Sequence, residues 1–216
     1  MFKKLFLTAI VFLLVTGFSY AEDSIKMKPI EFTKKKMRNH WNASFIYTDK
    51  GFGLGAKLFK PVSQNMDFEA GIMFAGVKDP QENEVYDYYG NSFVYGKINR
   101  VYEIPVSIGL QHYIFSEDLD ESFRPFLSIG VSPTLVLMDP YYMDFFKALG
   151  YISTAFAFGP YAGIGLEYNE SRNVSFCANL RYSYLPVLVN SVQSLKGKDI
   201  KDVGGIQIML GVNFLK

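Results

Sequence analysis

From Trp41 to the end of the chain, apolar and polar residues alternate with a period of two. This pattern predicts β-strands whose two faces meet different surroundings. The last stretch shows it most clearly, because one face carries Ile206, Ile208, Leu210, Val212 and Phe214. The same alternation predicts eight strands, over residues 40–48, 51–60, 67–76, 99–114, 124–137, 153–168, 173–186 and 204–216.

The face opposite the apolar one is small or polar in every predicted strand. Several strands carry charges there, namely Lys57, Glu69, Glu103, Glu167 and Arg181. So many charges cannot face a dry, packed core without partners. Aromatic residues also gather toward the strand ends, as they do at membrane interfaces. This arrangement favours a membrane-spanning barrel with a polar interior over a soluble sandwich.

The connections between the predicted strands alternate in length. Residues 60–66, 115–123 and 169–172 are short, whereas 77–98, 138–152 and 187–203 are long. Short periplasmic turns and long outer loops are typical of outer-membrane barrels, and an even strand count places both termini in the periplasm. The sheet must close because lipid offers no hydrogen-bond partners to an open edge. We therefore expect an all-β fold, an eight-stranded antiparallel up-and-down transmembrane β-barrel.

The beginning of the chain has the pattern of an export signal. Lys3 and Lys4 precede an apolar stretch over residues 5–15, and Ser19-Tyr20-Ala21 offers a cleavage site. This pattern predicts a cleaved signal peptide over residues 1–21. Residues 22–39 would form a basic periplasmic segment, either solvated or attracted to anionic headgroups or cell-wall polymer. Residues 40–216 would form the barrel.

Composition narrows the class of protein further. The net charge of +1 gives no reason to expect a nucleic-acid partner. Cys177 is the only cysteine, so the chain has no intramolecular disulfide and no cysteine-rich metal site. After the leader, no apolar run is long enough for a membrane-spanning helix. We expect no cofactor and no metal.

Three strand phrases carry a family resemblance, Tyr-Glu-Ile-Pro-Val (102–106), Arg-Pro-Phe-Leu-Ser-Ile-Gly (124–130) and Gly-Ile-Gly-Leu-Glu-Tyr (163–168). With them, the chain resembles the small outer-membrane β-barrel family of Gram-negative bacteria that includes the OmpA transmembrane domain and OmpX. The resemblance implies an architecture and not an activity. It also implies insertion by the barrel assembly machinery and contact with outer-membrane lipid. Eight strands leave an interior that side chains fill, so no wide pore is expected.

Some small barrels are enzymes that modify lipid A, and these depend on a histidine close to a serine or an acid. This chain has two histidines. His112 has the parity of the apolar face, and His40 precedes the first strand at the periplasmic rim. The sequence therefore predicts a protein that is not an enzyme.

The inward-facing charges should form ion pairs, because an unpaired buried charge costs several kcal/mol. Lys57 and Glu69 lie at similar depth in neighbouring strands, and Glu103 is the first choice of partner for Arg181. Glu167 belongs to the same expected network. Two interpretations stay open: a plug that fixes the shape of the barrel, or a gate whose ion pairs rearrange to pass ions.

Among the loops, the outer connection 138–152 allows the most specific predictions about structure and function. Asp139-Pro140 predicts the start of a short helix and Gly150 its end. Its side chains are unusually apolar for a solvated loop: Tyr141, Tyr142, Met143, Phe145, Phe146 and Leu149. The segment either rests on the rim or headgroups, or covers an apolar ligand or grips a surface partner.

Pro105, Pro133 and Pro160 lie inside predicted strands, where proline lacks a ladder donor, so bulges or missing bonds are expected there.

The function expected is a structural or surface-interaction role in the cell envelope. A small barrel that transports or binds ions or a hydrophobic ligand comes second, and a lipid-modifying enzyme third.

Overall fold

A closed β-barrel forms from the alternating part of the chain. The computed structural model describes residues 39–90, 92–114, 123–171 and 173–215, so the expected signal peptide and nearly all of the basic segment lie outside it. The barrel strands are β1 (His40–Thr48), β2 (Gly51–Ser63), β3 (Met66–Val77), β6 (Asn99–Tyr113), β7 (Phe123–Pro140), β8 (Ser153–Asn169), β9 (Val174–Ser183) and β11 (Gly205–Leu215). All eight predicted strands are present, and β2 and β7 are longer than expected.

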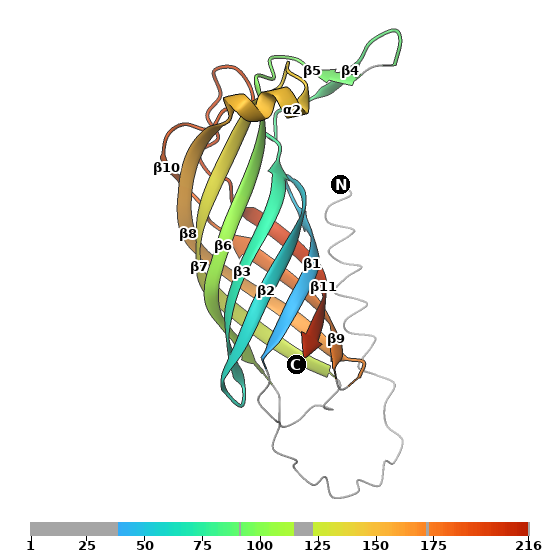
Figure 1. Cartoon of the computed structure of the whole chain (residues 1–216), viewed down its shortest axis with the longest axis vertical. Helices are drawn as coiled ribbons and strands as arrows, with labels where there is room; N and C mark the ends of the chain where they lie inside the picture. Colours follow the sequence, from blue (N-terminus) through green and yellow to red (C-terminus); the bar gives the residue numbers. More distant parts are fainter. Residues whose placement is uncertain (1–38, 91, 115–122, 172, 216) are drawn as a thin grey trace, which may run out of the picture. The chain divides into compact units, whose positions relative to one another are not determined.

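Every neighbouring pair of barrel strands is antiparallel. Strand β9 pairs with both β8 and β11, and β1 pairs with both β2 and β11, so the sheet has no free edge (Figure 1). The predicted fold class is confirmed. No helix in the described part of the chain is long and apolar enough to cross a membrane.

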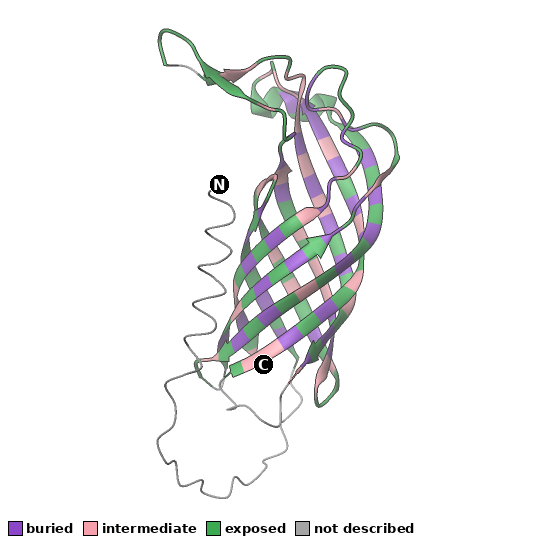
Figure 2. Ribbon diagram, turned by 180° about the vertical axis from the view of Figure 1, so that it is seen from behind, coloured by how far each residue is buried: buried purple, intermediate pink, exposed green. Residues whose placement is uncertain are grey.

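The two faces of the barrel have the distribution that the alternation predicted. Along β1 buried and exposed residues alternate strictly, and the buried ones are polar except Ile46; the same banding runs over the other strands (Figure 2). Large apolar side chains such as Phe52, Leu54 and Leu210 are more than half exposed. Glu69, Gln207 and Arg181, in contrast, are almost completely buried. Such an exterior is stable only in apolar surroundings.

The three long connections emerge at one end of the barrel, which we call the mouth (Figure 1). Residues 78–98 contain the hairpin of β4 (Glu84–Tyr86) and β5 (Ser92–Val94). Residues 141–152 contain the helix α2 (Phe145–Ala148) and the 3-10 turn η1 (Leu149–Tyr151). Residues 184–204 contain β10 (Val187–Val189), which pairs with β8. We call this third connection the inner segment.

The predicted start of the helix at Asp139-Pro140 is wrong. Both residues belong to the end of β7, where they pair with Arg100 and Asn99 of β6. The helix begins only at Phe145, after the N-cap residue Asp144. Asp139 does not cap because its carboxylate contacts the Arg100 guanidinium at 3.0 Å. The ion pair extends the β-ladder and delays the helix.

Pro160 lies at an interruption in the ladder along one edge of β8. The β8–β9 ladder ends with Tyr161 opposite Ser183, and β10 continues it in the same register, with Val187 opposite Ala157. Pro160 keeps one contact there, because its carbonyl accepts a hydrogen bond from the Tyr184 N–H at 3.0 Å. At the adjacent Gly159 a Cβ would overlap the Tyr184 carbonyl. The inner segment therefore begins beside β8 in the wall, and the register shifts only between Val187 and Val189.

Candidate functional site: the filled lumen and its mouth

The centre of the lumen is crossed by a cluster of charges around Glu69. Strands β3 and β9 lie opposite each other, with three strands between them in either direction. Glu69 of β3 nevertheless accepts a hydrogen bond from Arg181 of β9 at 2.7 Å. Lys57, on the neighbouring β2, contacts the other carboxylate oxygen at 3.4 Å. The Tyr161 hydroxyl donates to Glu69 at 2.5 Å, and the Arg181 guanidinium lies 3.9 Å from the centroid of the Tyr161 ring. We call Lys57, Glu69, Tyr161 and Arg181 the central cluster.

A second cluster fills the end of the lumen away from the mouth. Glu167 accepts hydrogen bonds from the Tyr113 hydroxyl and the Ser175 hydroxyl, each at 2.7 Å. Arg124, its partner across the β7–β8 ladder, lies 3.8 Å from the carboxylate. The polar chain continues through Ser175 to Asn213 and Asn42, at 3.1 and 2.7 Å. Glu167 is therefore compensated without the central cluster.

Glu103 does not pair with Arg181. Glu69 faces Gly109 in the β3–β6 ladder, and Glu103 lies six residues further along β6, which is about 20 Å of extended strand. Arg181 donates to Glu69 instead. Among the described residues, Glu103 Oε2 is buried without a hydrogen-bond partner. The expected single network is thus two separate clusters, with Glu103 in neither.

The half of the lumen nearest the mouth contains a cluster of apolar residues. Inward-facing residues of β3, β6, β7 and β8 pack against residues of the inner segment, and the cluster comprises Val77, Val101, Val136, Met138, Ala155, Ala157, Leu185, Val192, Ile200 and Val203. Leu185 and Val192 are completely buried. The inner segment therefore closes the lumen from above as a hydrophobic plug.

A small cavity separates the plug from the central cluster. Its volume is about 20 Å³, and its lining includes Lys57, Tyr161 and Arg181 of the central cluster and Leu185 of the plug. A single water molecule needs about 10–15 Å³. The lumen thus has no room for an organic ligand at this level.

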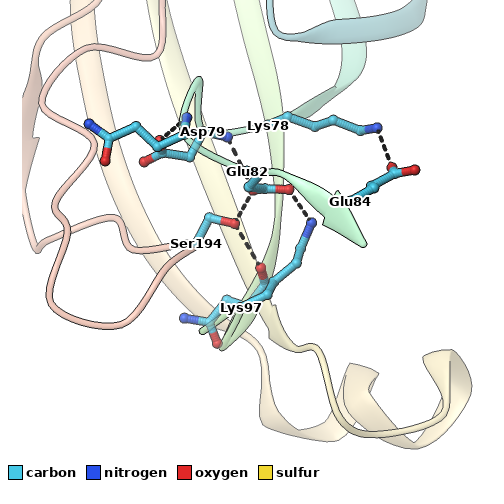
Figure 3. Close-up of polar contacts among 8 residues, drawn as sticks. Lys78, Asp79, Glu82, Glu84, Lys97 and Ser194 are labelled. Carbon is cyan, nitrogen blue, oxygen red and sulfur yellow. Dashed lines mark hydrogen bonds and ion pairs between the residues drawn. The ribbon is translucent and has the colours of Figure 1, made fainter. Parts of the chain in front are cut away.

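At the mouth, Glu82 locks the connection 78–98 to the inner segment (Figure 3). Its carboxylate accepts hydrogen bonds from Lys97 at 2.6 Å, from the Asp79 N–H at 3.1 Å and from the Ser194 hydroxyl. The Ile98 N–H donates to the Ser194 carbonyl at 2.8 Å. Although burial alone would raise the pKa of Glu82, the hydrogen bonds from Lys97, Ser194 and Asp79 lower it below the usual carboxyl value.

Arg100 fixes the base of the connection 141–152. Besides its ion pair with Asp139, it donates to the carbonyls of Tyr141 and Met143, both at 3.1 Å. The aromatic side chains beyond this clamp point outward: Tyr142 is 80% exposed and Phe146 84%. Phe145 and Leu149 are each about half exposed. The segment therefore presents an apolar surface held on an ordered base.

Solved structures contain the same barrel. The chain superposes on Neisserial surface protein A with a TM-score of 0.52 and 15% identity, over 82% of this chain and 94% of the other. The N-terminal β-barrel domain of Pseudomonas aeruginosa OprF gives 0.50 and 14%, over 84% and 98%. A major outer membrane protein from Thermus thermophilus gives 0.54 and 13%, over 82% and 99%. The sequence matches no protein-family model and no curated protein.

The chain has the fold of the small outer-membrane β-barrels. The resemblance expected from its strand phrases is confirmed at the level of architecture. The similarity comes from the backbone, because sequence identity is at most 15% in these three comparisons.

The two histidines occupy different faces of this barrel fold. His112 is exposed on the outer face of β6, whereas His40 is buried and stacks on Phe59 with ring centroids 4.5 Å apart. Within the described residues, no group of three histidine, cysteine or acidic side chains is placed to hold a metal ion.

Sequence reasoning missed several residues that complete the clusters. Tyr113, Tyr161 and Arg124 face inward by strand parity, and this signal was available. Glu82, Lys97 and Ser194 have no such signal, because they lie in loops whose contacts are 112 residues apart in sequence for Glu82 and Ser194. Contacts between loops so far apart in sequence become visible only once the barrel has closed and brought the loops together.

We expect the hydrogen bonds that Glu82 accepts, which we call the Glu82 lock, to weaken in acid. A lowered folded-state pKa means that the contribution of Glu82 to stability is fully present above the ordinary value of 4.5 and is lost as the pH falls through the folded-state value. Hydrogen exchange at Ile98 should therefore accelerate as the pH is lowered from about 6 to about 3, after correction for intrinsic exchange. The Glu82→Gln variant should show fast exchange with little pH dependence. A wild-type profile as flat as that of the variant would contradict the lock.

Proposed function

We propose that this protein is a non-enzymatic component of the bacterial outer membrane with a structural or surface-interaction role in the cell envelope. The observation that carries the proposal is the combination of an apolar exterior with a sealed lumen. Exposed residues on neighbouring strands, such as Phe45, Phe52 and Leu210, would contact outer-membrane lipid. Charged clusters and the plug fill the interior, so the wall and the loops are the surfaces left for interaction.

The orientation proposed follows from the loops. Strand β1 begins and β11 ends at the end opposite the three long connections, so periplasmic termini would place the mouth outside the cell. Insertion by the barrel assembly machinery fits this arrangement. The ordered, exposed aromatic residues of 141–152, Tyr142 and Phe146 above all, would then contact lipid headgroups or a surface partner.

A second candidate is a small barrel that binds or transports ions or a hydrophobic ligand. The central cluster favours the ion version, because Lys57 and Arg181 share one carboxylate and can exchange partners. An apolar ligand would need the outer loops, since the lumen cavity is too small for it. Single-channel recording separates the candidates: a sealed lumen predicts no steady conductance.

Membrane embedding can be tested by the depth dependence of arginine substitutions on the outer face. Leu210 lies in the middle of the outward row of β11, and Ile206 lies at its end near the mouth. Leu210→Arg should reduce the free energy of unfolding from bilayers by about 2–4 kcal/mol, and Ile206→Arg by about 0–1 kcal/mol.

The two positions form a matched pair, because both side chains are about half exposed on the same strand. Unfolding should be followed by urea titration in lipid vesicles. The same titration should be made in detergent micelles whose apolar layer covers less of the barrel wall. Equal and small losses at the two positions would argue against a lipid belt and with it against the proposed location.

A further inference from the structure

The central cluster carries an unbalanced positive charge. Lys57 and Arg181 are both cationic, and Glu69 is the one carboxylate that contacts them among the described residues. The next acids toward the periplasmic end are the buried Asp67, two residues from Glu69 along β3, and Glu167, which Arg124 compensates; neither lines the cavity. Glu103, toward the mouth, lies about 20 Å along β6 from the level of Glu69. An enclosed excess charge is expensive unless a counter-charge lies close to it.

The cavity beside this excess charge is lined by hydrogen-bond donors. Hydroxyls reach it from four strands, and they belong to Ser44, Ser107, Ser132 and Ser183. Lys57 and Arg181 line it as well. Apart from the Gln207 amide, whose NH₂ group is also a donor, the polar side chains around the cavity are cations and hydroxyls. No carboxylate of the described residues lines it.

Three polar groups at the cavity have hydrogen-bonding capacity left over. Arg181 Nε, Ser183 Oγ and Gln207 Oε1 are buried and have no hydrogen-bond partner among the described residues. Each of the three residues is at least 97% buried. Arg181 Nε–H can only donate, Ser183 Oγ can donate or accept, and Gln207 Oε1 can only accept. Buried donors of this kind need an acceptor close by.

We propose that the cavity is a binding site for one small monovalent anion, such as chloride. The anion would neutralise the excess charge of Lys57 and Arg181 and accept hydrogen bonds from Arg181 Nε and Ser183 Oγ. A volume of about 20 Å³ exceeds the ~10–15 Å³ that a water molecule needs, which suits an ion slightly larger than water. Organic and polyatomic anions would not fit.

The site would also explain why the central cluster holds two cations against one carboxylate. In the absence of an anion, Lys57 and Arg181 repel each other across Glu69. With the anion bound, two positive and two negative charges alternate in space. The lumen would then contain an ion as a permanent part of its packing.

The test is a halide titration of the full chain refolded in detergent micelles, with gluconate keeping the ionic strength constant. Equilibrium unfolding and refolding lets the buried site exchange its ion. Chloride should stabilise the wild type with a saturating dependence, lowering the unfolding equilibrium constant at least ~10-fold once its concentration is well above Kd. Bromide should act similarly, and gluconate should have no effect.

Two variants separate an anion from a water molecule. Lys57→Met removes the excess charge and leaves the Glu69–Arg181 pair intact, so the chloride dependence should disappear while the protein still folds. Ser128→Ala is the control, because Ser128 Oγ is also a buried lumen hydroxyl without a partner among the described residues but does not line the cavity. It should keep the full chloride dependence. No chloride dependence in the wild type, or an equal dependence in Lys57→Met, would show that the cavity holds water only.

Discussion

Replacing Glu69 with glutamine should lower the free energy of unfolding by about 3–5 kcal/mol, the cost of removing one partner of a buried ion pair. The change removes the negative charge that contacts both Lys57 and Arg181. It also removes the strong acceptor of the Tyr161 hydroxyl. Glutamine has nearly the same shape, so the loss measures charge and not packing. Urea titration of the barrel in micelles or vesicles measures it.

A matched control is available at the mouth, where Glu84 pairs with Lys78 at 3.5 Å and both side chains are at least half exposed. Glu84→Gln should change stability by no more than about 0.5 kcal/mol. Combining Glu69→Gln with Arg181→Met should recover part of the loss, because the variant no longer buries an arginine without a counter-charge. Additive losses in the double variant would contradict the direct Glu69–Arg181 contact.

Replacing Val192 with aspartate should release the plug from the mouth of the lumen. Val192 is completely buried among apolar residues of the barrel wall, and a carboxyl group placed there loses its hydration, at a cost of several kcal/mol. The barrel ladders do not depend on this residue, so the wall should persist. Trypsin should then cut the inner segment after its lysines (Lys196, Lys198 and Lys201) at least ~100-fold faster, since each 1.4 kcal/mol is a factor of ten in the open population.

Ser191→Asp serves as the control, because it adds the same charge to the neighbouring, exposed position. Its cleavage rate should stay within about twofold of that of the wild type, as expected for a surface substitution. The central cluster lies below the plug, so single-channel recordings of Val192→Asp should still show a closed lumen. A steady conductance in this variant would mean that the plug, and not the central cluster, closes the barrel.

Most of the barrel could be predicted from the sequence because a strand in a membrane barrel has two incompatible environments. Residues such as Leu210 and Gln207 alternate so strictly that the register of a whole strand follows from either one. The position of the lumen charges followed from the same parity. Their partners did not, because parity gives the face of a strand but not the height of one strand relative to another. Arg181 was therefore assigned to Glu103, although the register brings it to Glu69.

The inner segment could not be predicted, for a different reason. Its apolar residues, Leu185, Val192 and Ile200 among them, have neither the alternation of a strand nor the periodicity of a helix. Their burial depends on the inward faces of β6, β7 and β8, which no local pattern reveals. Gly159-Pro160 interrupts an otherwise regular strand at the level where the inner segment begins. We expected a bulge or a missing ladder bond there, and the ladder along β8 is interrupted between β9 and β10 before it continues in the same register.

The apolar exterior is not equally tall on all sides of the barrel. On β8 the outward row of exposed residues runs from Phe156 to Tyr168, whereas on β1 it runs from Trp41 to Tyr47. At about 3.3 Å per residue these rows are about 40 Å and 20 Å long. A bilayer of uniform thickness covers both only when the barrel axis leans away from the membrane normal, or when the lipid thickens beside β8. The protein would then orient itself in the bilayer by its lopsided wall, and neighbouring proteins would meet a thicker membrane on one flank than on the other.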